Sequence, residues 1–440
     1  MQNPLLSKEI TTRENRIWVR IIAACNVKCI FCLDADAQNG TLIDDTKIRD
    51  QIRDGYKPGM TNRIIISGGE ASIHPKFADY VRYAKSVGYD RVQTVTNGNM
   101  FARREFCNKL FDAGLDEVTF SIHGHTAKLH DYLTAAPGSY ERAIRGLINV
   151  RKFFPTKIVN IDIVVNKMNV EYLPQMVKFF MRLGVYEFDI LQIIPFGRGF
   201  SQYKDQLFYR IEDYLGPLHD TWKLSKIPGV YMWTNRFQVE AFEGYEDLIQ
   251  DPRKIKSEVM GEALEEFSTF IESHGITKPH CYGEACDVCF LKQYCHDYID
   301  HQSHHLPAGD IQIYSGKDDP ITFRYLILRG EEFPSQVYEK YGNTGEEFVS
   351  RIQDIHLNSN QEIVNIPRCI REKNNSGLYE WDNDMSQEKN VAQYTKNYIL
   401  GLYRKKSTRC KSCKYNDSCE GLHINFIRSY GFNLLKPFLK

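Results

Sequence analysis

The sequence predicts an α/β protein in which a parallel sheet with helices is followed by a small cysteine-rich region. Two observations lead to this expectation. Between residue 16 and about residue 200, β-branched runs alternate with amphipathic segments. Three cysteines in the stretch CNVKCIFC follow the first run, and eight more lie beyond residue 280. Such alternation favours parallel strands joined by right-handed crossovers, either doubly wound or curled toward a barrel.

The predicted strands and helices follow one another regularly along the first half of the chain. Strands are expected at 17–23, 63–67, 91–95, 117–121, 158–165 and 187–193, and helices near 44–56, 75–88, 101–114, 139–153 and 171–184. Folds of this type gather functional groups at the carboxyl ends of their strands. Here those ends carry the three cysteines and then the stretches SGGE, TNGN, SIHGH, VNKMN and IIPFGRG. A single Gly-Gly or Asn-Gly is ordinarily part of a turn and carries little information. The evidence is that such stretches follow every predicted strand in order.

Length and composition limit the class of protein. A chain of 440 residues is too long for one core and predicts two or three domains. Its 56 basic residues equal its 56 acidic residues, so no overall field attracts nucleic acid or a membrane surface. The N-terminal stretch lacks the apolar core of a secretory signal, and no stretch has the roughly 20 apolar residues of a membrane span. We therefore expect a cytoplasmic protein whose clustered cysteines bind metal.

The first cysteine group leaves a metal site one ligand short of the usual four. Cys25, Cys29 and Cys32 are spaced C-x3-C-x2-C, Phe31 precedes the third cysteine, and Gly68-Gly69-Glu70 follows the second predicted strand. On these motifs, residues 16 to about 200 resemble the core domain of the radical S-adenosylmethionine (SAM) superfamily. The resemblance implies a partial (β/α)6 TIM-like barrel and a [4Fe-4S] cluster whose fourth iron is chelated by SAM. An electron from the cluster would cleave SAM to a 5′-deoxyadenosyl radical, which removes hydrogen from the substrate.

The same resemblance implies which residues contact SAM. Glu70 with the Gly68-Gly69 backbone is expected at the SAM amino group, and the Phe31 backbone at the adenine. Further expected contacts are Ser121 and His123 at the ribose, Asn166 beside the adenosyl group, Asn97 facing the same site, and Arg198 near a carboxylate. Alternatives stay open for three of them. The alternative for Asn97 is an ordinary turn residue, and for His123 it is a loop histidine hydrogen-bonded to the backbone. For Arg198 the alternative is a solvated surface charge.

The cysteines beyond residue 280 form an internal repeat of Pro-x-Cys followed by C-x2-C-x5-C. The first module contains Cys281, Cys286, Cys289 and Cys295, and the second module contains Cys369, Cys410, Cys413 and Cys419. Four thiolates suffice to close a structural zinc site. Behind a radical SAM core, however, the modules resemble SPASM and twitch extensions, which implies two auxiliary [4Fe-4S] clusters and three clusters in all. The further cysteine of the usual SPASM pattern is replaced by Ile299 and His423, so the assignment of cysteines to clusters stays open.

These observations predict a core domain at 16–200, a helical connection at 201–280 and a SPASM-like auxiliary domain at 281–440 with an insertion at 306–366. The resemblance favours a maturase that modifies a peptide or protein by cross-linking, thioether formation or epimerisation. The alternative is a dehydrogenase, dehydratase or epimerase acting on a small molecule such as a sugar, an aminoglycoside or a nucleoside. Either needs a flavodoxin- or ferredoxin-type electron donor. Because 24 residues before Cys25 are too few for a leader-binding domain, a peptide substrate would need a separate leader-binding protein or the insertion.

Two other classes fit less well. A glycyl-radical activating enzyme would carry a ferredoxin-like C-x2-C-x2-C-x3-C insert, which the sequence lacks. A non-enzymatic zinc or iron–sulfur scaffold would not need Gly68-Gly69-Glu70 after the second strand. Cys107, on an amphipathic segment among Phe106, Leu110 and Phe111, is expected to be a buried free thiol.

Overall fold

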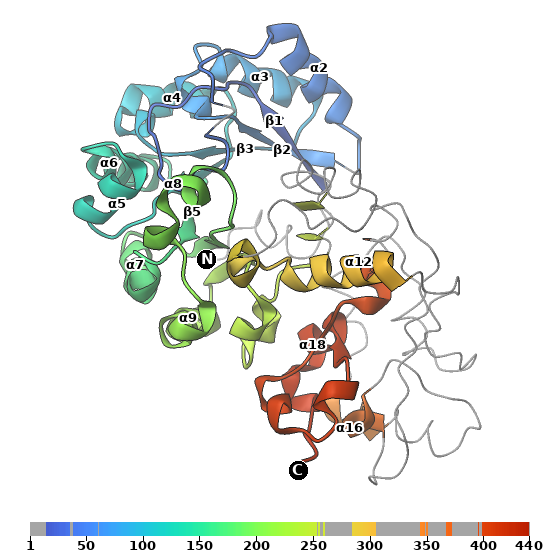
Figure 1. Cartoon of the computed structure of the whole chain (residues 1–440). Coiled ribbons are helices and arrows are strands. Elements are labelled where there is room, and N and C mark those ends of the chain that lie inside the picture. Colours follow the sequence, from blue (N-terminus) through green and yellow to red (C-terminus); the bar gives the residue numbers. More distant parts are fainter. Residues whose placement is uncertain are drawn as a thin grey trace. The chain divides into compact units, whose positions relative to one another are not determined.

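Figure 1 shows a computed structural model of the chain, which forms two compact units, Met1–Phe237 and Gln238–Lys440. The structure describes residues 15–35, 38–59, 61–252, 254–255, 258–259, 284–304, 344–347, 349–350, 367–371, 395 and 398–439.

A seven-stranded parallel sheet forms the first unit. The strands are β1 (Asn15–Arg20), β2 (Thr61–Ser67), β3 (Arg91–Thr96), β4 (Glu117–Ser121), β5 (Ile158–Val165), β6 (Glu187–Gln192) and β7 (Tyr231–Asn235). Each strand pairs in parallel with the next one along the chain, so the spatial order is β1 to β7 without a reversal. A doubly wound sheet would reverse its strand order at a switch point. The expected α/β fold and partial barrel are therefore confirmed.

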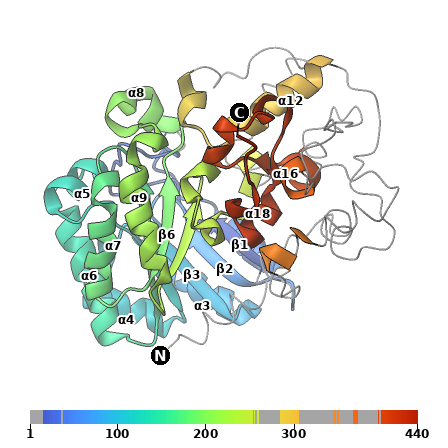
Figure 2. The ribbon, with the colours of Figure 1, turned by 90° about the horizontal axis from the view of Figure 1, so that it is seen from below.

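Helices connect the strands and cover the outer face of the sheet in both views (Figures 1 and 2). They are α2 (Asp45–Gly55), α3 (Phe77–Val87), α4 (Arg104–Asp112), α5 (Ala127–Thr134), α6 (Ser139–Phe153), α7 (Leu173–Arg182), α8 (Gly197–Leu207) and α9 (Leu215–Trp222). Alternate strand residues such as Ile64, Phe120 and Ile163 are completely buried. Because successive side chains of a strand point to opposite faces, these residues form one apolar face, which packs against the helices.

The opposite face is polar, and its amino-terminal part is closed by a buried network around Glu117. The Glu117 carboxylate accepts hydrogen bonds from Arg91 Nε at 2.6 Å and Asn160 Nδ2 at 2.7 Å, and Arg63 Nη2 lies 3.1 Å from it. All four residues are buried. Charges withdrawn from water must be paired, and this network pairs the charges buried at the amino-terminal part of the polar face. Ser121 and Asp162, toward the carboxyl ends, are only half-buried.

All six predicted strands are present, but two elements were missed. The segment expected to be a helical connection contains β7, which extends the sheet by hydrogen bonding to β6. Its sequence YMWTN has only five residues and one exposed face, so the alternation is too short to recognise. Helix α5 was also not predicted. The first compact unit extends to Phe237, and residue 200 lies within α8.

The second unit contains short elements that carry the cysteines. Its helices are α12 (Lys292–His304), α16 (Arg368–Arg371) and α18 (Ile424–Tyr430), and β8 (Arg404–Lys405) pairs antiparallel with β9 (Leu422–His423). The start of the unit is tied to the second module, because Glu243 Oε2 accepts hydrogen bonds from the Thr408 amide at 2.9 Å and the Thr408 hydroxyl at 2.6 Å. Cys281, and almost all of the predicted insertion at 306–366, lie outside the described residues. No helix in the described part of the chain is long and apolar enough to cross a membrane.

Candidate active site and a four-thiol site

The loop that carries Cys25, Cys29 and Cys32 leaves β1 at the carboxyl end of the sheet. Its backbone makes one hydrogen bond within the loop, from the Cys32 amide to the Cys29 carbonyl at 3.2 Å, and is otherwise anchored on neighbouring elements. The amides of Lys28 and Ile30 donate to the carbonyls of Thr134 and Leu133 at the end of α5, at 3.0 and 2.9 Å. Helix α5, which sequence reasoning missed, therefore positions the cysteine loop.

Gly68 and Gly69 allow the end of β2 to approach this chain segment closely. A Cβ atom on Gly68 would lie 2.5 Å from the Ile22 carbonyl oxygen, and one on Gly69 would lie 2.3 Å from the Ala24 carbonyl oxygen. Both distances are shorter than any real Cβ contact, so only glycine fits. The close approach lets the amides of Gly69 and Glu70 donate to the carbonyls of Ile22 and Ala24, at 2.9 and 2.8 Å. These contacts hold the residues that precede Cys25.

The Glu70 carboxylate joins the ends of β2 and β3. It is 2% exposed, and both oxygens are engaged. Oε1 accepts hydrogen bonds from the Ser72 amide at 3.0 Å and the Thr96 hydroxyl at 2.7 Å, while Oε2 accepts one from the Asn97 amide at 2.7 Å. Burial raises the pKa of Glu70, although these donors favour its charged form. The carboxylate thus links the segments that follow β2 and β3 inside the fold.

Asn97 fastens the cysteine loop to the third strand. Its side-chain Nδ2 donates to Oδ1 of Asn26 at 2.7 Å, and its own Oδ1 accepts from the Asn99 amide at 3.1 Å. Asn26 lies between Cys25 and Cys29. Sequence reasoning did not select Asn26, although its position inside the cysteine motif was the available signal.

The start of α8 packs against the last part of the loop. A Cβ atom on Gly197 would lie 2.7 Å from the Cys32 carbonyl oxygen. Arg198 follows, and its amide donates to that carbonyl at 3.2 Å while its guanidinium Nη1 donates to the Cys29 carbonyl at 3.3 Å. The Arg198 side chain is thus a partly buried partner of the loop rather than a solvated surface charge. Gln38 Nε2 lies 3.2 Å from Cys32 Sγ.

The three thiols are close enough to influence one another's ionisation. Burial raises the pKa of Cys25 to about 11 and raises the pKa values of Cys29 and Cys32 as well, and Cys25 and Cys32 add to the rise at Cys29. The charge of Arg198 acts in the opposite direction at Cys29 and Cys32. Grouped, partly buried thiols of this kind become thiolates when a metal centre binds them. Their chemistry fits the three ligands expected for an iron–sulfur cluster.

Phe31 and His123 lie edge to face beside this loop, with ring centroids 4.6 Å apart. His123 is buried, and its Nδ1 accepts a hydrogen bond from the Val164 amide at 3.1 Å. Burial holds the pKa of His123 well below its usual value, so the ring is neutral and carries its hydrogen on Nε2. The Asn166 side chain is completely buried within a turn, where Oδ1 accepts from the Met168 amide at 3.0 Å and Nδ2 donates to the Val164 carbonyl at 3.1 Å.

Asp162 and Asp189 are acidic residues on the polar face that sequence reasoning missed. They are paired in register on β5 and β6. The Ser121 hydroxyl donates to Asp162 Oδ2 at 3.2 Å, and Asn235 Nδ2 donates to Asp189 Oδ1 at 2.6 Å. Burial, reinforced by Asp189, raises the pKa of Asp162 to about 8. The signal was the polar alternation in the otherwise apolar strand IVNIDIVV.

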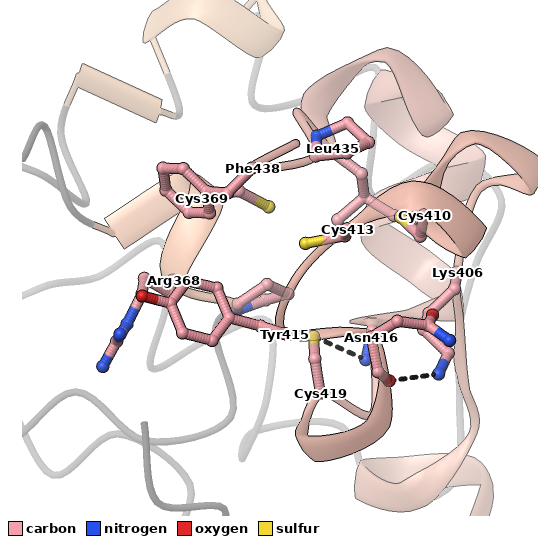
Figure 3. Close-up of a pocket in the computed structure, with 13 residues that line it drawn as sticks. Arg368, Cys369, Lys406, Cys410, Cys413, Tyr415, Asn416, Cys419, Leu435 and Phe438 are labelled. Atoms are coloured by element: carbon pink, nitrogen blue, oxygen red, sulfur yellow. Dashed lines mark hydrogen bonds between the residues drawn. The ribbon is translucent and has the colours of Figure 1, made fainter. Parts of the chain in front are cut away.

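The four cysteines of the second module line one pocket (Figure 3). Cys369 comes from α16, and Cys410, Cys413 and Cys419 come from the turns between β8 and β9. Burial raises the pKa of Cys369 to about 12, and the other three thiols contribute to this rise. Apolar and aromatic residues complete the wall, among them Tyr415, Leu435, Pro437 and Phe438. The repeat had predicted these four cysteines as one set.

Three thiols of the first module, Cys286, Cys289 and Cys295, are buried. Cys289 donates its amide to the Cys286 carbonyl at 3.3 Å. His423 is also buried, and its Nε2 pairs with the Ile399 carbonyl at 3.0 Å, as a packed histidine would. Among the residues that the structure describes, no three or more His, Cys, Asp or Glu side chains are arranged around a single metal ion.

The radical SAM superfamily profile matches residues 19–180. Together with the parallel half-barrel and the cysteine loop at its carboxyl end, this match identifies a radical SAM domain in the chain. The AdoMet-dependent heme synthase of Methanosarcina barkeri is 31% identical over 185 residues, covering 41% of this chain and 50% of that protein. A probable GTP 3′,8-cyclase of Saccharolobus solfataricus is 28% identical over 202 residues, covering 45% and 63%. The chain therefore matches less than two thirds of the length of these relatives.

Two solved structures of peptide-bound proteins are also similar. SuiB from Streptococcus suis, bound to its precursor peptide SuiA, aligns with a TM-score of 0.43 at 15% identity, over 56% of this chain and 54% of that chain. The protein anSMEcpe, with bound AdoMet and the Cp18Cys peptide, aligns with a TM-score of 0.40 at 15% identity, over 49% and 62%.

Proposed function

We propose that this protein is a SPASM-like radical SAM enzyme of the oxidoreductase type that modifies a peptide or protein. The observation that carries the proposal is the cysteine loop, which presents three partly buried thiols at the carboxyl end of the half-barrel, held by Gly69, Asn97 and Arg198. When bound to these thiolates, a [4Fe-4S] cluster with SAM supplies a 5′-deoxyadenosyl radical that removes hydrogen from an unactivated C–H bond. Thiols that must stay reduced fit the cytoplasm, where we place the protein.

The residues around the loop then have distinct roles. Both oxygens of the Glu70 carboxylate are engaged inside the fold, whereas the carbonyl oxygens of Gly68 and Gly69 accept no hydrogen bond within the described residues. We therefore assign recognition of the SAM amino group to these carbonyls. Glu70 has the role of holding them in position. Arg198 balances the negative charge of the three thiolates.

The other predicted contacts divide into two groups. Phe31 keeps its expected backbone role at the adenine, and the neutral His123 can donate a hydrogen bond from Nε2 to the ribose. Ser121 is half-buried and remains a candidate for the same ribose. Asn97 and Asn166 act differently, because their amides are already engaged with Asn26 and with the turn after β5. They position the site.

The cysteine modules would each hold an auxiliary [4Fe-4S] cluster. In the second module, four thiols share a pocket walled by aromatic and apolar side chains, which supports a fully ligated centre shielded from water. Four protein ligands leave no open position for a substrate, so this centre would accept or store an electron. Cys286, Cys289 and Cys295, with Cys281, would form the first auxiliary site. A flavodoxin- or ferredoxin-type protein would serve as the electron donor.

The metal content tests this proposal directly. After anaerobic purification and reconstitution, we expect about twelve irons per chain with matching sulfide, which corresponds to three [4Fe-4S] clusters. About four irons and two zinc ions per chain would instead show a single cluster beside two zinc sites, and the auxiliary clusters would be ruled out. A chain that binds no iron would contradict the whole proposal.

The substrate class needs a separate experiment. The resemblance to SPASM enzymes favours a peptide, which would require a separate leader-binding protein or a second binding element in the chain. A small-molecule substrate is the second candidate, because the names of the curated relatives refer to heme and to GTP. Reconstituted protein with SAM and reductant should be incubated with a precursor peptide encoded beside its gene, and separately with nucleotides and tetrapyrroles. A mass change confined to the peptide would support modification of peptides, and one confined to a small molecule would overturn it.

A further inference from the structure

Positive charge is concentrated around the second module. The whole chain is neutral, with 56 basic and 56 acidic residues. Residues 401–440, in contrast, contain nine basic and two acidic residues, a net charge of +7. The basic residues are Arg404, Lys405, Lys406, Arg409, Lys411, Lys414, Arg428, Lys436 and Lys440, and the acidic ones are Asp417 and Glu420. Such a local excess in a neutral chain creates a positive field at one place on the surface.

Part of this charge is neutralised within the second unit. Lys405 Nζ lies 3.0 Å from Glu240, and Arg409 Nε lies 3.3 Å from Glu243. Burial opposes ionisation of both carboxylates, but Lys405 lowers the pKa of Glu240, and hydrogen bonds from Ser407, Thr408 and Arg409 lower the pKa of Glu243. These pairs attach the start of the unit to the second module.

Three further lysines are exposed and are sequence neighbours of residues that line the pocket, and the charge of one of them, Lys411, also acts on Glu240. Lys411 lies between Cys410 and Cys413, Lys414 follows Cys413, and Lys436 lies between the pocket residues Leu435 and Pro437. The ion pairs found within the described residues include none of these three. We call Lys411, Lys414 and Lys436 the basic rim. Lys406 and Arg368 add positive charge to the pocket wall itself (Figure 3).

We propose that the basic rim is the docking surface for an acidic one-electron carrier protein. The inference rests on the proposed second auxiliary cluster. Complementary charge steers a protein partner to one place and raises its association rate. The rim lysines are sequence neighbours of Cys410, Cys413 and other residues that line the four-thiol pocket, so a carrier docked there is close to the centre that these thiols would hold.

The step is an outer-sphere transfer. One electron would pass to the oxidised carrier from the reduced cluster that Cys369, Cys410, Cys413 and Cys419 would hold. No covalent bond forms or breaks, and no proton moves between the two proteins. The cluster would have received this electron from the substrate radical that the proposed hydrogen abstraction leaves, and it would return to its oxidised state. Because all four ligands come from the protein, this transfer needs no vacant coordination position.

A charge-reversal variant tests the docking surface in the full chain. The rim variant carries K411E, K414E and K436E, and the matched control carries K57E, K109E and K178E, which reverse three exposed lysines of the first unit. The probe is a purified flavodoxin, and the readouts are its dissociation constant by biolayer interferometry and its one-electron reduction in a stopped-flow spectrometer. At low salt, the rim variant should react at least about tenfold more slowly, and the control should stay within about twofold of the unaltered protein. The difference should shrink at high salt, because salt screens the attraction.

The outcomes separate the two proposals. Unchanged flavodoxin binding by the rim variant, with full iron content, would overturn the docking surface and leave the clusters in place. Zinc instead of iron at the second module would overturn the cluster and with it the electron transfer. Loss of binding to a single-stranded RNA, with flavodoxin binding retained, would assign the rim to nucleic acid and would also contradict the inference.

Discussion

The side chain of Asn97 donates a hydrogen bond to Asn26 across 2.7 Å, which ties the end of the third strand to the loop that carries the three clustered cysteines. The two residues are 71 positions apart in the sequence. Asn97 is held further, because its Oδ1 accepts a hydrogen bond from the Asn99 amide and its own amide donates to Glu70. The geometry of the loop thus depends on a residue outside the cysteine motif.

Replacing Asn97 with alanine should loosen this loop. The buried Asn97 side chain would lose its hydrogen bonds to Asn26 and to the Asn99 amide, which costs about 1–2 kcal/mol of unfolding free energy. Iron should also be lost more rapidly to a chelator. The matched control is Asn149→Ala, because the Asn149 side chain donates to the Phe101 and Ala102 carbonyls far along the sequence from the cysteines. Equal iron loss from both variants would show that Asn97 has no special role at the loop.

Removal of one thiol from the loop should abolish SAM cleavage. Cys29→Ala leaves two ligands, so we expect about four irons fewer per chain and no 5′-deoxyadenosine by chromatography. Cys107→Ala is the control, since Cys107 is completely buried and its thiol contacts the Phe101 carbonyl at 3.2 Å. It should keep its iron and its SAM cleavage despite a modest loss of stability. Normal 5′-deoxyadenosine formation by Cys29→Ala would disprove the assignment of the loop.

Cys413→Ala should separate SAM cleavage from product formation. The second module would lose about four irons, whereas the loop that holds Cys25, Cys29 and Cys32 would be unaffected. We expect 5′-deoxyadenosine to form without modified substrate. Ser412→Ala changes the adjacent exposed residue and should preserve both activities. Unimpaired product formation by Cys413→Ala would make the second module a structural site.

Asp162 should make the stability of the chain depend on pH. Its pKa in the folded protein is raised to about 8 from the usual 3.8, so the folded state binds a proton that the unfolded state has released. This contribution to stability is fully present below pH 3.8 and is lost as the pH rises toward 8. The charged groups facing it are Asp189, which raises its pKa, and Arg236, which lowers it.

Asp162→Asn should therefore flatten the change of melting temperature between pH 5 and pH 8, as measured by differential scanning fluorimetry. Asp79→Asn, at an exposed position on α3, should leave the pH profile as it is. An equally steep profile in the Asp162→Asn variant would show that Asp162 is ionised in the folded protein at neutral pH.

Phe438→Ala should open the pocket of the second module to water and oxygen. The Phe438 ring lines the pocket and lies edge to face against Tyr415, with centroids 5.7 Å apart. We expect a loss of about 2 kcal/mol in stability and a bleaching of the iron–sulfur absorbance in air that is several-fold faster. Phe179→Ala, which removes a similar ring contact with Phe180 in the first unit, serves as the control. Equal bleaching in the two variants would mean that the ring does not protect the site.

Sequence reasoning predicted the features whose pattern lies within a short stretch of the chain. Strands, helices and cysteine spacings are local, and the duplicated cysteine pattern was sufficient to select Cys369, Cys410, Cys413 and Cys419 as one set. Contacts between distant segments were not predictable, such as Asn97 with Asn26 or Lys28 with the end of α5. Glu70 shows a further limit. Its place after two glycines was recognised, but only the structure shows that its carboxylate is used inside the fold.

The anchoring of the cysteine loop bears on the order in which the holoprotein is assembled. Backbone hydrogen bonds from α5, β2 and the start of α8 hold the loop, and none of them requires a metal. Small zinc domains, in contrast, fold only when the ion binds, since they have little other structure. In this protein the polypeptide can complete its half-barrel first. A maturation system can then deliver iron and sulfide to a cysteine loop that is already in position. Iron starvation should consequently yield a folded, inactive precursor that remains ready for loading.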